Sequence, residues 1–121
     1  MIYIVEDDPA SREVLSGRLS LNRLEHQTFN SAEALLAALP RADPPTFFIV
    51  DIRLPGLTGL QLMEQLREDL RYQNIPAIAV TAQHNDRLVS SALHAGFKEC
   101  LPKPIDGKYI VALIKKYSNP H

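Results

Sequence analysis

The most informative segment of the chain reads Ile2-Tyr3-Ile4-Val5-Glu6-Asp7-Asp8-Pro9, an apolar run followed at once by acids and a proline. A short continuous apolar run that ends in polar residues is typical of a parallel strand covered on both faces. Asp8 and Pro9 together indicate a helix start, because aspartate caps helices and proline suits their first position. The segment therefore predicts a buried strand whose carboxyl end carries acids and leads into a helix.

The same unit recurs along the chain. Apolar runs lie at residues 46–50, 75–80 and 97–101, and a weaker, alternating run lies at 26–29. Helical periodicities separate these runs, and one of them has Leu60, Met63, Leu66 and Leu70 on its apolar face. Helix starts are expected at Asp8, Ser31, Thr58 or Gly59, Asn85 and Asp106.

Five strand–helix pairs in strict alternation predict an α/β protein with three layers, built on a doubly wound sheet of parallel strands. Numbered along the chain, the strands are expected in the order 2-1-3-4-5, with the polar run 26–29 at one edge. In such a sheet the site lies at the carboxyl ends of the strands, where the order reverses between strands 1 and 3.

Composition limits the possible classes. The 121 residues are 45% hydrophobic and 22% charged, which predicts one domain over residues 1–121. Thirteen Lys and Arg against 14 Asp and Glu argue against a module that binds nucleic acid through bulk positive charge. The single Cys excludes a disulfide framework and a multi-cysteine zinc site. With no apolar run near the roughly 20 residues of a membrane span, we expect a soluble, cytoplasmic domain without membrane insertion.

Polar side chains stand where the predicted strands end. Glu6 and Asp7 follow the first strand, Asp51 ends the third, Thr81 ends the fourth and Lys103 follows the fifth. Taken singly, each has an ordinary structural explanation as a loop acid, turn residue, cap or solvated lysine. Their joint placement at one edge of the sheet predicts a functional site.

The chemistry of this set favours phosphoryl transfer. An all-oxygen cluster of carboxylates without His or Cys suits a hard ion, and we expect Mg²⁺. A carboxylate beside Mg²⁺ and Lys103 is suited to attack phosphorus, because the positive charges offset that of an arriving phosphoryl group. Asp51 is the expected nucleophile, and Thr81 would hydrogen-bond a phosphoryl oxygen.

Together the motifs at residues 4–8, 49–59, 80–82 and 101–104 resemble those of receiver domains of two-component response regulators. The resemblance covers essentially the whole chain and implies the flavodoxin-like, receiver type of the doubly wound fold. It also implies that Asp51 is phosphorylated by a histidine kinase or a histidine phosphotransfer protein. Asp7 and Asp51 would bind Mg²⁺ directly with the backbone carbonyl of Arg53, and Glu6 would act through a metal-bound water.

The resemblance further implies a conformational switch. Lys103 would contact the phosphoryl group, with a cis bond to Pro104, and Thr81 would move toward the phosphoryl oxygens. This movement would restructure the face formed by the fourth and fifth strand–helix pairs. A downstream output protein or domain would read that face, and a homodimer through the fourth and fifth helices is a further option. The chain itself is expected to be a signalling domain whose only reactions are its own phosphorylation and dephosphorylation.

Four positions near the predicted site have their own expectations. Cys100 stands at the switch position where relatives usually carry Tyr or Phe, and a small thiol cannot swing between rotamers as a ring does. Arg53 and Gln83 flank the site, where such residues tune the loss of the phosphoryl group. His84 lies near the mouth of the site and is expected to be a solvated loop residue.

Two other functions remain open. One is a receiver-like interaction module that works without phosphorylation. This alternative stays open because Cys100 occupies the switch position. The other is a phosphatase with an aspartyl nucleophile, but Arg53 occupies the place where that class needs a second acid. Direct DNA binding has no support, because no helix-turn-helix segment remains after the strand–helix pairs are assigned.

Overall fold

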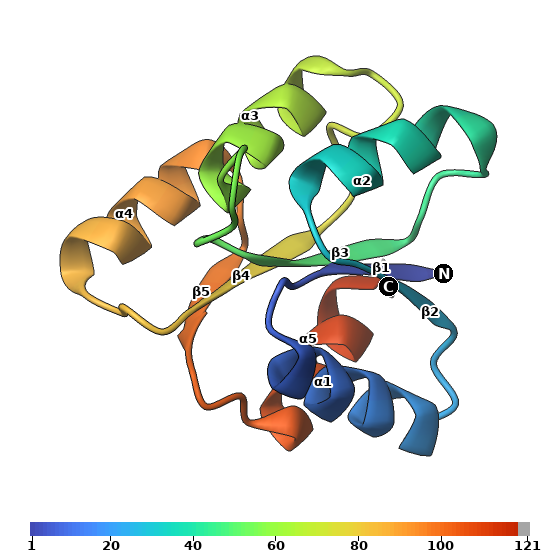
Figure 1. Cartoon of the computed structure of the whole chain (residues 1–121), viewed down its shortest axis with the longest axis vertical. Helices are drawn as coiled ribbons and strands as arrows, with labels where there is room; N and C mark the ends of the chain where they lie inside the picture. The colour runs from blue at the N-terminus through green and yellow to red at the C-terminus, as the bar shows by residue number, and fades with distance from the viewer. Residues whose placement is uncertain (119–121) are drawn as a thin grey trace.

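The structure is a computed structural model that describes residues 1–118. Its five strands form one parallel sheet in the order β2-β1-β3-β4-β5. The strands are β1 (Ile2–Val5), β2 (His26–Phe29), β3 (Phe47–Asp51), β4 (Ala77–Thr81) and β5 (Glu99–Pro102). The helices are α1 (Pro9–Leu21), α2 (Ala32–Ala38), α3 (Gly59–Glu68), α4 (Asp86–Ala95) and α5 (Gly107–Ser118), with a 3-10 turn η1 (Leu39–Arg41) after α2. Figure 1 shows α2, α3 and α4 on one face of the sheet and α1 and α5 on the other, which confirms the predicted three-layer doubly wound fold.

The helix starts follow from capping. Asp8 accepts a hydrogen bond from Ser11 N at 3.0 Å, and the Ser31 and Asn85 side chains cap α2 and α4 in the same way. Between the two candidates for α3, the structure selects Thr58, whose hydroxyl and backbone pair with Gln61 in a capping box. These predicted caps are therefore confirmed. They could be read from the sequence because a capping side chain and the N–H groups that it binds lie within one helical turn.

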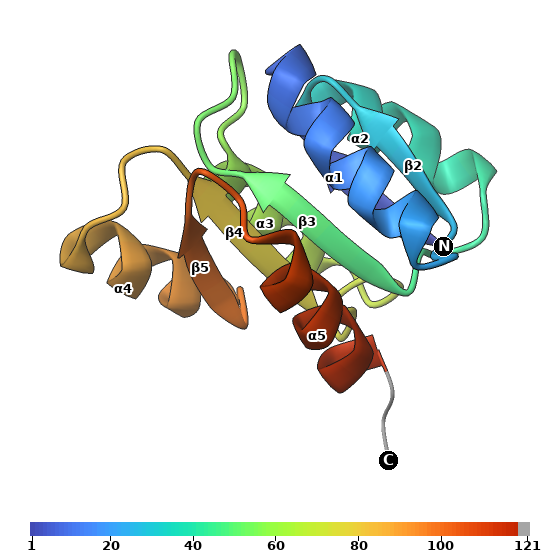
Figure 2. The same cartoon turned by 90° about the horizontal axis from the view of Figure 1, so that it is seen from below.

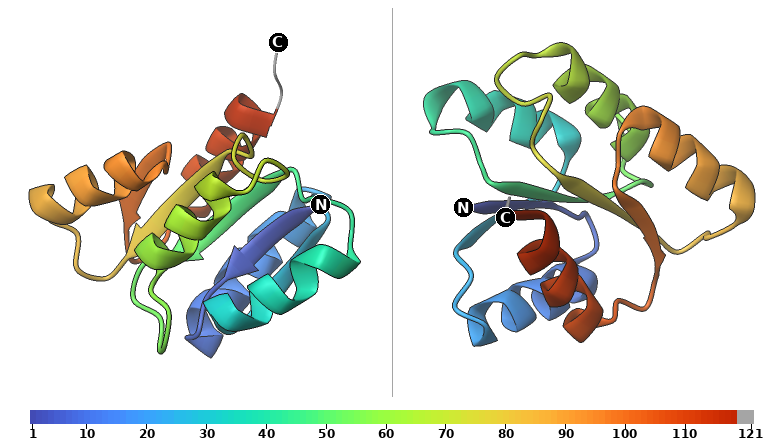
Figure 3. Two further views of the ribbon diagram at one scale, coloured as in Figure 1. Left: turned by 90° about the horizontal axis from the view of Figure 1, so that it is seen from above. Right: turned by 180° about the vertical axis from the view of Figure 1, so that it is seen from behind.

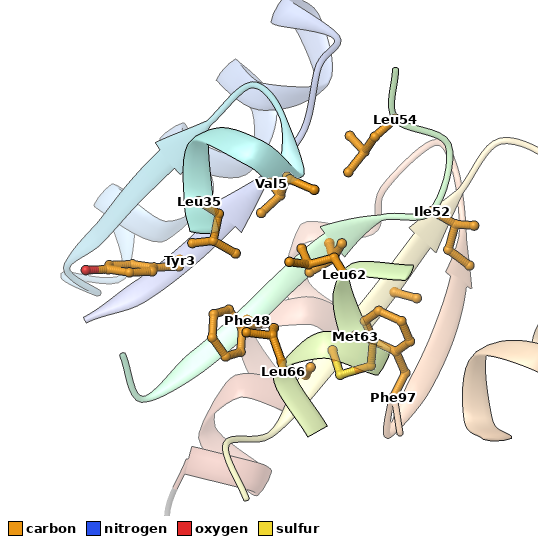
Figure 4. Close-up of a cluster of buried hydrophobic side chains, with 14 of the residues drawn as sticks. Tyr3, Val5, Leu35, Phe48, Ile52, Leu54, Leu62, Met63, Leu66 and Phe97 are labelled. Atoms are coloured by element: carbon orange, nitrogen blue, oxygen red, sulfur yellow. The ribbon is translucent and has the colours of Figure 1, made fainter. Parts of the chain in front are cut away.

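The core consists of two apolar clusters, one on each face of the sheet. All residues of β1, β3 and β4 are buried, as expected for strands covered on both sides. Figure 4 shows the cluster under α2 and α3, where Phe48 of β3 lies near Leu62, Met63 and Leu66 of α3. The second cluster packs α1 and α5 on the opposite face. Burying each large side chain stabilises the fold by about 1.5–3 kcal/mol, so these clusters hold the three layers together.

The structure corrects one detail of the apolar stripes. Leu70 lies beyond the end of α3 and is 83% exposed. Helix α3 stops because Asp69 has an extended backbone and its carbonyl accepts from Tyr72 N and Gln73 N in a new turn. A helical period cannot reveal such a competing turn, so the prediction for Leu70 was wrong.

The strand bounds also shift by one or two residues. β4 begins after Pro76, and Phe97 donates its N–H to Ala92 O at 3.1 Å, which completes the end of α4 instead of opening β5. At the other ends, Asp51 and Thr81 are the last residues of β3 and β4, as predicted. Figure 2 shows the arrowheads of β3, β4 and β5 at the same edge, with the loop between β3 and α3 extending beyond it. That edge holds the candidate site.

The part of the chain that the structure describes contains no helix long and apolar enough to cross a bilayer.

Candidate functional site

The site forms where β1 and β3 lie side by side. Val5 pairs with Val50, so Glu6 and Asp51 follow at neighbouring strand ends. The chain leaves β1 toward α1 on one face and leaves β3 toward α3 on the other, and the right view of Figure 3 shows α1 and α3 on opposite sides of the sheet. The strand order thus opens a crevice at the position expected for a doubly wound sheet.

Lys103 joins the acids across the crevice. Its ammonium Nζ donates to Asp51 Oδ2 at 2.8 Å and lies 2.5 Å from Glu6 Oε1. The carboxylate oxygens of Glu6, Asp7 and Asp51 lie within 4.8 Å of one another. The structure therefore brings all four residues together, although they come from three separate strand ends.

Burial disfavours the charged forms of the groups in this cluster. Glu6 is fully buried and Asp51 is 4% exposed, while Asp7 is exposed at the rim. Burial raises the pKa of Glu6 to about 7, and the nearby Asp51 carboxylate adds to the shift while Lys103 opposes it. Burial alone would lower the pKa of Lys103, but the carboxylates of Asp51 and Glu6 outweigh it and raise that pKa.

The donor set fits a divalent cation. One ammonium cannot balance three clustered carboxylates, and the Lys103 ammonium already contacts both Glu6 and Asp51. Clustered carboxylates repel one another unless a cation or a proton compensates their charge. Oxygen ligands on this scale match Mg²⁺ better than a softer metal.

Arg53 belongs to the loop that leaves β3. Its N–H donates to Asp51 Oδ1 at 3.0 Å, which fixes the start of the loop against the acid. Its guanidinium Nη2 donates to Gln83 Oε1, so the two residues predicted to flank the site touch each other. The side chain thus bridges the loops after β3 and β4 instead of pairing with an acid.

Thr81 is fully buried at the end of β4. Its hydroxyl accepts a hydrogen bond from Gln83 N at 3.1 Å, and its carbonyl accepts from Lys103 N at 2.9 Å. The loop that follows Thr81 is therefore connected both to its hydroxyl and, through Gln83, to Arg53.

Cys100 is buried in β5, and burial raises the pKa of its thiol, as expected for a packed strand residue. Its carbonyl lies 3.0 Å from Nε2 of His84 in the loop after β4. His84 is exposed, as predicted, but it is not free in solvent, because its ring contacts the backbone of β5. The Lys103–Pro104 bond is cis.

Two residues near the site were missed by the sequence reasoning. Arg12 on α1 donates to Glu6 O at 3.0 Å and to Asp7 O at 3.4 Å, so it fixes the backbone of the loop between β1 and α1. Glu33 on α2 accepts from Leu57 N at 3.0 Å in the loop after β3. Neither residue belongs to a recognisable motif, and only the packing of the helices reveals the contacts.

A separate hollow lies between α3 and α4, with a volume of about 730 Å³. Its lining includes Arg67, whose guanidinium donates to the carbonyls of Tyr72, Gln73 and Gly96. These contacts occupy the guanidinium, so Arg67 connects α3 to the segments that follow α3 and α4.

Comparisons with known proteins agree with this geometry. The DNA-binding transcriptional regulator NtrC of Salmonella typhimurium is 34% identical over 116 residues, which cover 96% of this chain and 24% of that protein. This chain therefore spans about a quarter of the length of NtrC. The structure of a CheY-like response regulator receiver domain protein from Methanospirillum hungatei has 25% identity and a TM-score of 0.87, covering 98% of this chain and 92% of that one.

A further solved structure shows the same fold at lower identity. It is the receiver domain of a sensor histidine kinase from Pseudomonas aeruginosa, with a magnesium ion coordinated in its active site cleft. Its TM-score is 0.87 at 22% identity, covering 97% of this chain and 95% of that one. The sequence model of the response regulator receiver domain matches residues 2–115, which include all five strands and the acids at their ends. The chain therefore belongs to the response regulator receiver domain family of two-component signalling.

Proposed function

We propose that the chain accepts a phosphoryl group on Asp51 in a reaction that depends on Mg²⁺. The supporting observation is the environment of Asp51, which is 4% exposed, lies 2.8 Å from Lys103 Nζ and shares the crevice with Glu6 and Asp7. An Asp51 carboxylate oxygen would form a bond to phosphorus while the bond from phosphorus to the donor's imidazole nitrogen breaks. The electron pair leaves with that nitrogen.

The residues around Asp51 have complementary tasks. Lys103 balances the negative charge of the arriving phosphoryl group, and the Thr81 hydroxyl donates to one of its oxygens after release from Gln83. Asp7, Asp51 and the Arg53 carbonyl would hold Mg²⁺ directly, and Glu6 would contact it through water. When bound, the ion supplies positive charge that lets the anionic partners approach.

Receiver domains of this family interact with histidine kinases and with output domains. For this chain we propose a histidine kinase or a histidine phosphotransfer protein as the donor, and a downstream protein or attached domain as the recipient of the signal. The likeness to NtrC is compatible with an attached output domain, because the match covers 24% of that protein. The face formed by β4, α4, β5 and α5 is the proposed output surface, and its α4 and α5 part is the proposed homodimer contact.

The switch differs from the family pattern at Cys100. We propose that movement of Thr81 reaches the output face through the loop after β4 rather than through a swinging ring. His84 supports this route, because it joins that loop to the Cys100 carbonyl at 3.0 Å. Asn85 lies next in the chain and caps α4, so a shift of the loop moves the start of the helix.

The test is incorporation of phosphate from acetyl phosphate into the full chain. We expect at most one equivalent per chain, dependence on Mg²⁺, and loss of the label in Asp51→Asn but not in the matched Asp43→Asn, which alters an exposed loop acid. A folded wild-type chain that takes up no phosphate would instead support the interaction module without phosphorylation. Release of many equivalents of product from a phosphoester would support the phosphatase.

A further inference from the structure

The loop after β3 carries the Arg53 carbonyl and protrudes past the strand ends (Figure 2). Its two ends are fixed close to the sheet. At the start, Arg53 N donates to Asp51 Oδ1 at 3.0 Å, and at the end Gly59 N donates to Ile52 O at 2.9 Å. The tip between them needs a separate support, because a protruding loop otherwise samples many backbone conformations.

Glu33 provides that support from the first turn of α2. Its Oε2 accepts a hydrogen bond from Leu57 N at 3.0 Å, across 24 residues of sequence. The Leu57 N–H, and secondarily the N–H of Glu33 itself, lower the pKa of this carboxyl group. Glu33 is therefore an ionised acceptor, which makes a stronger hydrogen bond than a neutral one.

Gly56 shows how closely the loop and Glu33 approach. Its φ of +75° lies in the left-handed region, and a Cβ atom there would collide with Glu33 Oε2 and lie 3.1 Å from its Cδ. The positive φ therefore favours glycine at the position next to Leu57, and a side chain added there would displace the Glu33 carboxylate. The loop tip therefore packs directly against the Glu33 carboxylate at Gly56 and hydrogen-bonds to it at Leu57.

We propose that Glu33 is a positioning residue for the metal and phosphoryl site, a role that rests on the proposed function. Glu33 touches neither the acids nor the phosphoryl group. By holding Leu57, it limits the paths that the loop can take and so keeps the Arg53 carbonyl near the place where Mg²⁺ binds. Without this tether, metal binding must also order the loop, and the cost of ordering weakens affinity.

The test measures Mg²⁺ affinity by calorimetry and NMR titration of the full chain. In Glu33→Ala we expect affinity to fall about three- to tenfold, as for loss of one charge-assisted hydrogen bond. The phosphorylation rate should fall at limiting Mg²⁺ and recover to within about twofold at saturating Mg²⁺. Glu33→Gln keeps an oxygen acceptor for Leu57 N and should restore most of the affinity. Glu64→Ala removes an exposed glutamate from α3 and should leave affinity unchanged.

Hydrogen exchange of the Leu57 amide provides a second measurement that does not depend on activity. Exchange should accelerate in Glu33→Ala and remain slow in Glu33→Gln and Glu64→Ala. Equal Mg²⁺ affinity in wild type and Glu33→Ala, or equal loss in the Ala and Gln variants, would overturn the proposal. A wild-type chain that binds no Mg²⁺ would instead refute the proposed function, so the two failures are distinguishable.

Discussion

Lys103 Nζ donates a 2.8 Å hydrogen bond to Asp51 Oδ2 across 52 residues of sequence, and this contact joins the ends of β5 and β3. The side chain of Lys103 is 16% exposed and that of Asp51 is 5% exposed, so solvent screens the pair weakly. The ammonium also contacts Glu6, so it partly neutralises both buried carboxylates.

The first prediction concerns removal of that charge. Without Mg²⁺, Lys103→Ala should lower the free energy of unfolding at pH 8 by about 3 kcal/mol, because it leaves buried carboxylates unpaired. The loss should be smaller at pH 6, where Glu6 can take up a proton. Urea unfolding in EDTA provides the measurement, and Lys108→Ala removes an exposed lysine of α5 as the control. Equal stability of both variants at pH 8 would show that the ion pair contributes nothing.

The second prediction follows from the pKa of Glu6, which burial raises to about 7 from 4.5. The folded state then holds this proton more tightly than the unfolded state, so the free energy of unfolding falls as pH rises from about 4.5 through about 7. Glu6→Gln lacks this titration. From pH 5 to pH 8 in EDTA, the variant should gain on the order of 2 kcal/mol relative to wild type. Saturating Mg²⁺ should reduce the difference.

Paired urea titrations across this pH range measure that gain, and Glu64→Gln, an exposed change on α3, should run parallel to wild type. Parallel curves for Glu6→Gln and wild type would mean that Glu6 titrates normally in the folded protein.

The third prediction separates metal binding from stability. Asp7 is exposed at the rim, so Asp7→Asn should change the free energy of unfolding by less than about 0.5 kcal/mol. Its effect on Mg²⁺ affinity should be large, at least about tenfold, because a direct charged ligand is lost. Calorimetric titration with Mg²⁺ measures this, with Asp43→Asn as a charge-matched control. Unchanged affinity in Asp7→Asn would remove Asp7 from the ligand set.

The fourth prediction concerns the bridge between Arg53 and Gln83. If Arg53 acts on dephosphorylation through this contact, then Arg53→Ala and Gln83→Ala should change the half-life of the phosphorylated chain in the same direction. The double variant should add little, since both single changes remove the same contact. Half-lives measured by loss of label complete the double-mutant cycle. Additive effects would show that the two residues act separately, and an unchanged half-life in Arg53→Ala would eliminate the idea.

The fifth prediction concerns the route from Thr81 to α4. His84→Ala removes the contact with the Cys100 carbonyl, so the amides of the loop at residues 82–85 should exchange several-fold faster. Phosphate uptake should persist, because His84 does not touch the acids. His94→Ala, at an exposed position of α4, is the matched control. Unaltered exchange in His84→Ala would mean that the loop is held by Thr81 and Gln83 alone.

Much of the fold was predictable because it depends on short-range patterns. The apolar run before Glu6 and the proline after Asp8 each act within a few residues of chain. The exception at Leu70 has a similar origin, since the turn at Asp69 competes locally with the helix and the apolar period alone does not reveal which one prevails.

The residues that gather at the candidate site were predictable from the sequence, but the contacts that hold them were not. Glu6, Asp51, Thr81 and Lys103 stand at strand ends, and parallel strands bring such ends to one edge whatever the side-chain details. The partners of Glu33, His84 and Arg53 could not be foreseen. Each contact joins loops or helices far apart in the chain, and it depends on how the layers pack.

The sequence by itself determined the alternation of strands and helices and the helix caps, because periodicity and capping operate within a few residues. That alternation, with the polar run at 26–29, favoured the strand order that gathers the acids at one edge. Only the tertiary structure decided how these acids are held. The distance from Lys103 to Asp51, the burial that raises the pKa of Glu6 and the seat of Leu57 on Glu33 depend on segments brought together by packing. Charge interactions and desolvation vary with those distances, and no local pattern in the chain encodes them.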